Sequence, residues 1–196
     1  VRPANVIAFT FTEKAAAELK ERVHRTVTAK LPGIVGLAEM YIGTMHGFCL
    51  DLLQTYIPET FKYGVLTDIT QQLLIDRETN KSGFNTAVKT VQGVESSLRR
   101  YTDTRVFKGA LSILQEDAVD FGLVPPETTA SLAKYKDFLA DKRYFDYTSM
   151  MVEAVGFLER SQTATILDTA EQSLRDHVEN DVKYVIVDEY QDVNPI

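Results

Sequence analysis

Two adjacent carboxylates, Asp188 and Glu189, directly follow the apolar run Tyr184-Val185-Ile186-Val187. A continuously apolar run of this kind is typical of a strand covered on both faces in a parallel sheet, so we expect the two acids at the strand's tip. Nucleotide hydrolases keep there an acid that holds Mg²⁺, directly or through water, beside a second acid that activates the attacking water. Capping of the following helix explains the two acids alone equally well, but Gln191 and Asp192 favour the catalytic interpretation.

A second segment, Ala8 to Leu19, has two hydroxyls and an aromatic ring at the end of the strand-like run Val6 to Phe11. Thr12 is a predicted N-cap, and the helix after it has apolar residues at helical spacing, namely Ala16, Leu19, Val23 and Val27. A strand end followed by a helix N-terminus suits phosphate contact and base stacking. Taken alone, the segment is better explained as an amphipathic helix with a solvated charged face and a core Phe11.

A third segment, Ile42 to Phe48, again predicts a strand end that leads into a helix. Gly43 and Gly47 allow close approach of the backbone, and Thr44 and His46 can donate hydrogen bonds to phosphate. A lone histidine is more often a cap or a satisfied surface residue. Ligands in open α/β sheets bind at the carboxyl ends of strands, so we expect chemistry at these three strand ends.

The composition is that of an ordinary globular protein, because 44% of the 196 residues are hydrophobic and 25% are charged. A net charge of −7 argues against nucleic-acid binding by bulk charge, so any such contact must be local. Residues 1–30 are locally basic, with six Lys or Arg against three acids. No apolar run approaches the roughly 18 residues of a membrane span, so no membrane partner is expected.

The single cysteine, Cys49, permits no internal disulfide and makes no metal-ligand spacing with the three scattered histidines. We expect it to pack beside the apolar stripe of its helix. The lone thiol and the lack of targeting signals predict a cytoplasmic location. The start at Val1, without an initiator Met, is interpreted as a cut.

Between about Pro58 and Arg143 the strand-like runs give way to helical patterns. Residues 82–93 are polar and poorly periodic, and they are predicted as a loop or a short irregular helix. The sequence therefore predicts an α/β layer with a parallel sheet, interrupted by an all-helical insertion of roughly 80 residues. The expected segments are 1–60 in the layer, 61–142 in the insertion and 143–196 back in the layer.

Four segments in this order resemble the amino-terminal motor domain of superfamily 1 DNA helicases of the UvrD/Rep type. They are Thr10 to Leu19 (TFTEKAAAEL), Gly43 to Gly47 (GTMHG), Val187 to Asp192 (VDEYQD) and, more weakly, Asp146 to Met151 (DYTSMM). The resemblance covers essentially the whole chain. It implies an incomplete P-loop NTPase (RecA-like) sheet, with 1–60 and 143–196 in motor domain 1A and 61–142 as a 1B-like insertion.

The resemblance also implies functional residues. Asp188 would hold Mg²⁺, Glu189 would be the catalytic base for ATP hydrolysis, and Gln191 would neighbour the terminal phosphate or the coupling machinery. The residues expected to face single-stranded DNA are Phe11, Thr12, Thr44 and His46. ATP and Mg²⁺ are the implied cofactors, and the implied partners are single-stranded DNA, a second motor domain and a nuclease or repair protein.

The sequence departs from the family's pattern at several points. Glu13 stands where the family usually has Asn and puts a negative charge near the proposed phosphate path, while Thr148 and Ser149 replace two acids. No Gly-x-x-x-x-Gly-Lys-Ser/Thr loop for ATP phosphates (Walker A) occurs in this chain. The chain alone is therefore expected to bind ATP weakly and to be inactive.

Two other function classes remain open at this stage. One is a non-catalytic nucleic-acid-binding or scaffold module that keeps the α/β frame of a helicase, which is consistent with the missing phosphate loop. The other is a metal-dependent hydrolase centred on Asp188 and Glu189, which needs further acids or histidines at the strand tip.

Overall fold

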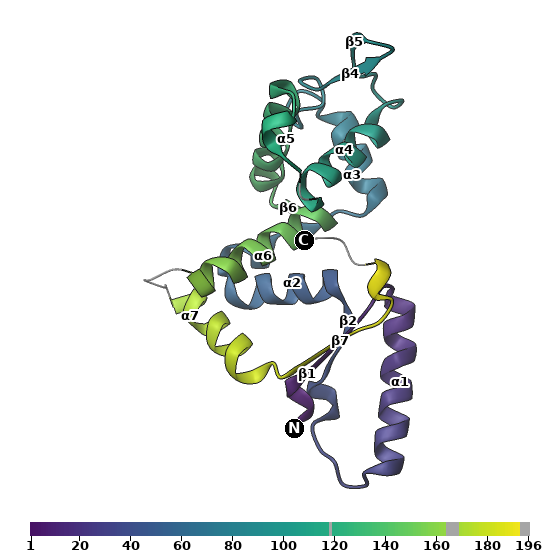
Figure 1. The fold of residues 1–196 in the computed structure, drawn as a ribbon, viewed down its shortest axis with the longest axis vertical. Coiled ribbons are helices and arrows are strands. Elements are labelled where there is room, and N and C mark those ends of the chain that lie inside the picture. The colour runs from purple at the N-terminus through teal and green to yellow at the C-terminus, as the bar shows by residue number, and fades with distance from the viewer. Residues whose placement is uncertain (118, 164–168, 193–196) are drawn as a thin grey trace. The chain divides into compact units, whose positions relative to one another are not determined.

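The computed structural model describes residues 1–117, 119–163 and 169–192 (Figure 1). Its backbone forms two compact units. The first comprises Val1–Pro58 and the described residues from Glu153 onward, and the second comprises Glu59–Val152. None of the described helices combines the length and the apolar character that crossing a lipid bilayer requires.

The first unit is built on a three-stranded parallel sheet. Its strands are β1 (Val6–Thr10), β2 (Tyr41–Thr44) and β7 (Tyr184–Val187), in the order β2-β1-β7. The predicted β2 and β7 are confirmed residue for residue, and β1 ends one residue earlier than predicted. The sheet is therefore the α/β layer that the apolar runs indicated.

Helices cover the sheet from two sides (Figure 1). Helix α1 (Glu13–Lys30) lies on one side, while α2 (Met45–Tyr56) and α7 (Thr169–Asp176) lie on the other. This is the arrangement that right-handed crossovers, the usual kind, produce when a chain runs from β1 to β2 and then back past β1 to β7. The later part of α6 (Tyr147–Thr163) adds Phe157 to a core that also contains Leu52 and Leu174.

The remaining turns of the first unit are short helical segments: the 3₁₀ turns Pro3–Asn5, Leu37–Glu39 and Tyr190–Asp192, and a π-helical turn at His177–Asp181.

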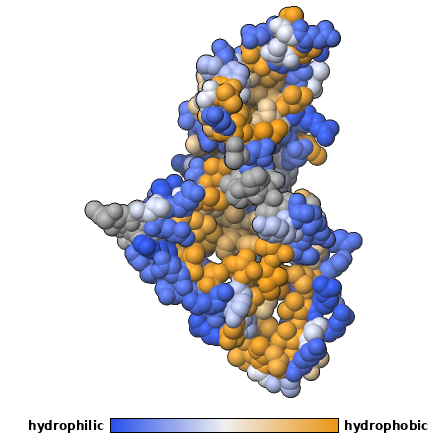
Figure 2. All heavy atoms as spheres, viewed as in Figure 1, coloured by the Kyte–Doolittle hydropathy of each residue, from blue (hydrophilic) through white to orange (hydrophobic). Residues whose placement is uncertain are grey.

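Strand β7 is not covered on both faces, which corrects the expectation from its apolar sequence. Tyr184, Val185 and Ile186 are 53%, 55% and 56% exposed. Figure 2 shows a broad apolar area over this part of the first unit. The physical reason is its place in the sheet, because β7 is an edge strand that pairs only with β1 among the described residues.

The second unit is mainly helical, with α3 (Asp68–Arg77), α4 (Thr104–Glu116), α5 (Pro126–Lys142) and the start of α6. Short 3₁₀ turns lie at Pro58–Lys62 and Phe121–Leu123. Its helices enclose one apolar cluster, made of Leu66, Ile75, Phe84, Ala87, Phe107, Leu111, Leu114, Leu132, Tyr135, Phe138 and Leu139.

The expectation of an all-helical insertion is wrong. A parallel pair joins β3 (Gly64–Val65) to β6 (Tyr144–Phe145), and an antiparallel hairpin joins β4 (Val88–Val91) to β5 (Val94–Ser97). The hairpin turn is Gln92-Gly93, with φ angles of 52° and 79°. Two positive φ values are those of a tight type I′ turn, which matches the twist of paired strands.

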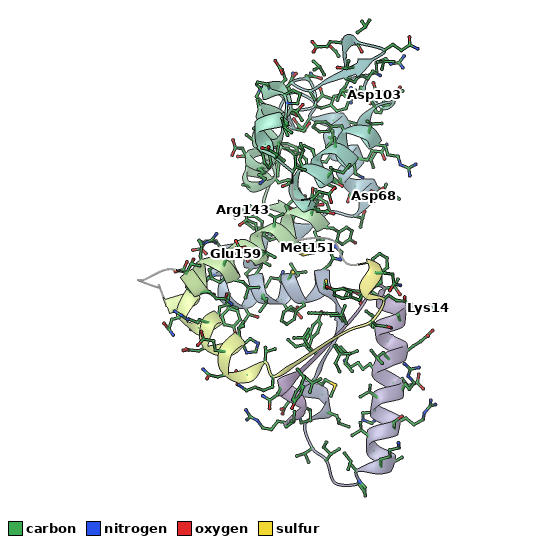
Figure 3. All side chains as sticks on the ribbon, in the orientation of Figure 1. Lys14, Asp68, Asp103, Arg143, Met151 and Glu159 are labelled. Atoms are coloured by element: carbon green, nitrogen blue, oxygen red, sulfur yellow. The ribbon has the colours of Figure 1, made fainter. Side chains whose placement is uncertain are left out.

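Ion pairs and buried polar groups hold the hairpin on the second unit. Lys89 Nζ in β4 lies 2.7 Å from Asp103 Oδ2, and Asp103 lies at the start of α4 (Figure 3). The Lys89 ammonium and the Arg99 backbone N–H both donate to this carboxylate and lower the pKa of Asp103.

Candidate functional site

The three polar segments meet at one edge of the sheet. Because the strands are parallel and in register, Thr10 lies beside Thr44, and Phe9 lies beside Val187. One residue further on, the Asp188 N–H donates to the Phe9 carbonyl oxygen at 2.9 Å. The carboxyl ends of β1, β2 and β7 thus bring the acids and the two hydroxyl-bearing segments to the same edge, where open α/β sheets bind ligands.

Asp188 and Glu189 extend from β7 as exposed side chains. Asp188 Oδ1 accepts from the Glu189 backbone N–H at 3.1 Å, and the Gln191 side-chain amide donates to Glu189 Oε2. Glu189 itself has a φ of 53°, in the left-handed region that costs a non-glycine residue about 1–2 kcal/mol. Backbone conformations of this kind concentrate at functional sites.

The carboxylates of Asp188 and Glu189 suit a magnesium ion whose other ligands are substrate phosphates and water. The described residues include no group of three or more His, Cys, Asp or Glu that could enclose a metal. Mg²⁺ is usually held by one or two carboxylates together with substrate phosphates and water. Asp188 and Glu189 supply that number of carboxylates, and both are open to solvent.

The segment that follows β1 exposes the ring of Phe11 and caps helix α1. Thr12 is the N-cap of α1, and its Oγ1 accepts from the Ala15 N–H at 3.1 Å. Thr10 is buried, and its hydroxyl donates to the Thr12 carbonyl at 3.1 Å. Phe11, between them, is 64% exposed. The interpretation of Phe11 as a core residue is therefore wrong, and its ring is open to a stacking partner.

At the end of β2, Thr44 makes its hydrogen bonds within the protein. Its hydroxyl donates to Glu13 Oε1 at 2.8 Å, and its Oγ1 accepts from the Gly47 N–H at 3.1 Å. The side chain is the N-cap of α2, and Thr44 as a whole is 7% exposed. His46 is the second residue of α2 and is half-buried at the same edge.

The two glycines of this segment make room for Tyr41. A Cβ atom at Gly43 would lie 2.6 Å from the Tyr41 hydroxyl oxygen, and one at Gly47 would lie 2.9 Å from it. The Tyr41 hydroxyl donates to the Thr44 carbonyl at 2.9 Å. The close approach that the sequence predicted is thus made by an internal side chain.

Three aromatic rings, those of Phe9, Tyr41 and Phe48, pack against one another beside the ends of β1 and β2. The ring centroids of Tyr41 and Phe48 are 5.0 Å apart, and Phe9 lies 5.3 Å from Phe48, all with edge-to-face geometry. Burial, followed by the negative charge of Asp51, raises the pKa of Tyr41. The tyrosine hydroxyl therefore stays protonated and keeps donating to the backbone of Thr44 at neutral pH.

Comparison with known sequences decides the family. The sequence model described as "UvrD/REP helicase N-terminal domain" matches residues 1–196. The chain belongs to the UvrD/REP helicase N-terminal domain family. The order and spacing of the segments at the sheet edge had indicated this family, and the match extends over the whole chain.

Relatives of this UvrD/REP domain include proteins named as DNA helicases. An "ATP-dependent DNA helicase PcrA" of Staphylococcus aureus is 28% identical over 196 residues, covering 99% of this chain and 24% of the relative. A "Probable DNA helicase" of Mycoplasma pneumoniae is 26% identical over 199 residues, covering 99% of this chain and 34% of the relative. The chain thus spans about a quarter to a third of the length of these curated relatives.

The fourth segment of the UvrD/REP resemblance has a buried polar role in the second unit. Asp146 is 3% exposed, and its carboxylate accepts from the Ser149 N–H at 2.7 Å, while the Asp146 N–H donates to Ser149 Oγ at 3.0 Å. This reciprocal pair is a capping box at the start of α6. Tyr135 Oη and Gln71 Nε2 also donate to Asp146 Oδ2, at 2.6 and 2.7 Å.

Sequence reasoning missed two residues of the UvrD/REP domain's sheet edge. It treated Glu13 only as a charge and did not single out Tyr41. The sequence contains a signal for each residue. Glu13 directly follows the N-cap Thr12, which places its side chain near a strand end. Tyr41 precedes Gly43 by two residues and Gly47 by six, and both glycines leave space for its side chain. The pairing of Glu13 with Thr44 depends on strand register, which the sequence does not specify.

Cys49 lies in α2 and is half-buried. Burial raises the pKa of its thiol to about 11, so the nucleophilic thiolate is scarce at neutral pH. The structure offers no support for a thiol enzyme at this position.

Proposed function

We propose that the parent protein is an ATP-dependent DNA helicase or translocase that couples ATP hydrolysis to movement on single-stranded DNA. In this proposal residues 1–60 and 143–196 belong to a RecA-like P-loop motor domain, and 61–142 form its 1B-like insertion. The observation that carries the proposal is the common sheet edge, where Asp188 N bonds to Phe9 O at 2.9 Å, two residues before Phe11. Acids for hydrolysis and groups for DNA are adjacent there.

The acids at the end of β7 have distinct proposed roles. When bound, Mg²⁺ with ATP supplies charge neutralisation on the transferred phosphate. Asp188, with one oxygen accepting from the Glu189 N–H, holds the metal directly or through water. Glu189 accepts the proton of the attacking water, and the Gln191 amide that donates to it orients the carboxylate near the terminal phosphate.

The ends of β1 and β2 form the proposed single-stranded-DNA surface. Phe11 stacks on a base, since its ring is 64% exposed and stacking needs an open face. Thr12 and His46 lie in or beside the first turns of α1 and α2, where helix dipoles favour phosphate. Thr44 is the fourth residue that the family resemblance assigns to this surface, and its hydroxyl makes two hydrogen bonds within the protein.

The chain alone is proposed to be inactive. Its sequence has no phosphate-binding Walker A loop, and it spans about a quarter of the length of the PcrA relatives. A second motor domain of the same polypeptide and a nuclease or repair protein are the further proposed partners. A second candidate is a non-catalytic nucleic-acid-binding or scaffold module with the helicase frame.

The test is ATP hydrolysis by the full natural polypeptide that contains this chain. We expect magnesium-dependent turnover that single-stranded DNA stimulates, and Glu189→Gln is expected to reduce it by about 10²- to 10⁴-fold. Because Glu189 is exposed, the variant should fold normally. DNA binding without any turnover would favour the scaffold module. The 196-residue chain is expected to show no turnover above its own Glu189→Gln control.

A further inference from the structure

The hydroxyl of Thr44 uses its one hydrogen inside the protein. A hydroxyl has one hydrogen to donate and two lone pairs to accept with. Thr44 donates its hydrogen to Glu13 Oε1 at 2.8 Å and accepts from the Gly47 N–H at 3.1 Å. With 7% of the residue exposed, this arrangement leaves no hydrogen of the side chain directed at a phosphate.

Glu13 links two segments that are distant in sequence. It is the first residue of α1 after the N-cap Thr12, whereas Thr44 is the N-cap of α2, 31 positions later. The strands themselves pair up to Thr10 and Thr44. Beyond that point the chain turns away into two helices, and the Glu13–Thr44 hydrogen bond ties the two helix starts together.

We infer that Glu13 is a positioning residue that holds the ends of β1 and β2 together as one DNA-binding surface. The inference rests on the proposed function, and it gives Thr44 a positioning role in place of direct contact with DNA. A hydrogen bond to a charged group is stronger than one between neutral groups, so a carboxylate at position 13 is a strong acceptor for the Thr44 hydroxyl.

The same carboxylate opposes DNA through its charge. Glu13 is exposed at the edge proposed to contact phosphates, so its charge repels the strand while its hydrogen bond orders the surface. Lys14, which extends into solvent with 88% of its side chain exposed (Figure 3), is the neighbouring cation. The two effects of Glu13 can be separated, because Gln keeps an oxygen acceptor without the charge and Ala removes both.

The test measures the affinity of the full natural polypeptide for oligothymidylate by fluorescence anisotropy at several salt concentrations. We expect Glu13→Gln to bind about two- to fivefold more tightly than the unmodified protein, with a steeper salt dependence, because one repulsive charge is gone. Glu13→Ala should bind about five- to tenfold more weakly than Glu13→Gln, because the Thr44 hydroxyl loses its acceptor.

Variants of Thr44 complete the test. Thr44→Val should weaken binding. Glu13→Ala added to Thr44→Val should cause no further loss, since both remove the same hydrogen bond, and should instead bring the two- to fivefold gain expected from loss of the charge. Thr44→Ser keeps the hydroxyl and is expected to bind as the unmodified protein does. Equal affinities for Glu13→Gln and Glu13→Ala would overturn the inference, because Glu13 would then act through charge alone.

A readout without DNA separates this inference from the proposed function. Amide hydrogen exchange at Gly47, whose N–H donates to Thr44 Oγ1, should accelerate in Glu13→Ala and stay unchanged in Glu13→Gln. A protein that does not bind oligothymidylate contradicts the proposed function but leaves this exchange result to decide the positioning role. Unchanged exchange in Glu13→Ala would overturn the positioning role.

Discussion

The backbone N–H of Asp188 donates a hydrogen bond to the carbonyl of Phe9 at 2.9 Å. This contact lies one residue beyond the last paired residues of β7 and β1. It fixes the first acid of the proposed hydrolytic pair against the strand whose end presents Phe11. The acids and the proposed DNA surface therefore share one rigid backbone support, the paired ends of β7 and β1.

Phe11→Ala should weaken binding of single-stranded DNA by the full natural polypeptide by about 1–3 kcal/mol, the usual contribution of one stacked base. Thermal stability should change little, because the ring is 64% exposed. Anisotropy titration with oligothymidylate and thermal melting measure the two effects. Leu31→Ala is the matched control. Leu31 is 58% exposed and directly follows α1, whereas Phe11 lies just before that helix.

Phe9→Ala should show the opposite pattern. Phe9 packs between Tyr41 and Phe48, with centroids 6.1 and 5.3 Å away, so its removal should cost about 2–4 kcal/mol of folding stability. A Phe11→Ala variant that melts as early as Phe9→Ala would show that Phe11 is a packing residue.

Asp146→Ala should destabilise the second unit by about 2–4 kcal/mol, because it leaves the buried Tyr135 hydroxyl without its acceptor and removes one of the two hydrogen bonds of the Gln71 amide together with the cap of α6. Tyr135→Phe removes one of those donors and should cost about 1 kcal/mol. Urea unfolding of both variants measures the difference. Equal losses for the two variants would mean that the capping of α6 by Asp146 contributes nothing.

The buried thiol of Cys49 predicts a pH dependence. Its pKa is raised by burial from 9.0 to about 11 in the folded protein, so the folded state holds its proton to higher pH than the unfolded state does. This contribution to stability is complete below pH 9 and is lost as the pH rises from about 9 to 11.

Alkylation by iodoacetamide measures this thiol directly. In the folded protein its rate at pH 8 should be far below that of free cysteine and should rise until about pH 11, because the thiolate is the reactive form. The Cys49→Ala variant should lack the loss of stability between pH 9 and 11 that the thiol causes. Half-maximal alkylation near pH 8.5 in the folded protein would contradict the burial of the thiol.

Elements with strong local signals could be predicted from the sequence. The apolar runs specify β1, β2 and β7, and the N-caps Thr12 and Thr44 mark the starts of α1 and α2. Each signal lies within a few residues of the element that it specifies, so no tertiary information is needed. Asp188, Glu189 and Phe11 directly follow the ends of β7 and β1, so their place at the sheet edge follows from the same signals.

Features that depend on pairing could not be predicted in the same way. The β4–β5 hairpin has four-residue strands, and its Gln-Gly turn is a weaker signal than Asn-Gly. The sequence therefore predicts only a loop or a short irregular helix over residues 82–93, which include β4 and the turn. The hydrogen bond between Glu13 and Thr44 joins residues 31 positions apart and depends on the register of β1 and β2. The exposure of β7 follows from its edge position, because an apolar run specifies a strand without specifying its neighbours.

Photocrosslinking at position 11 tests most directly whether this sheet edge binds single-stranded DNA. Phe11 is replaced by p-benzoylphenylalanine in the full natural polypeptide, and the same replacement at Leu31 is the control, since both side chains are exposed. The account predicts a crosslink to oligothymidylate from position 11 and none from position 31. No crosslink from position 11 in a protein that binds the oligonucleotide, or equal crosslinks from both positions, would contradict it.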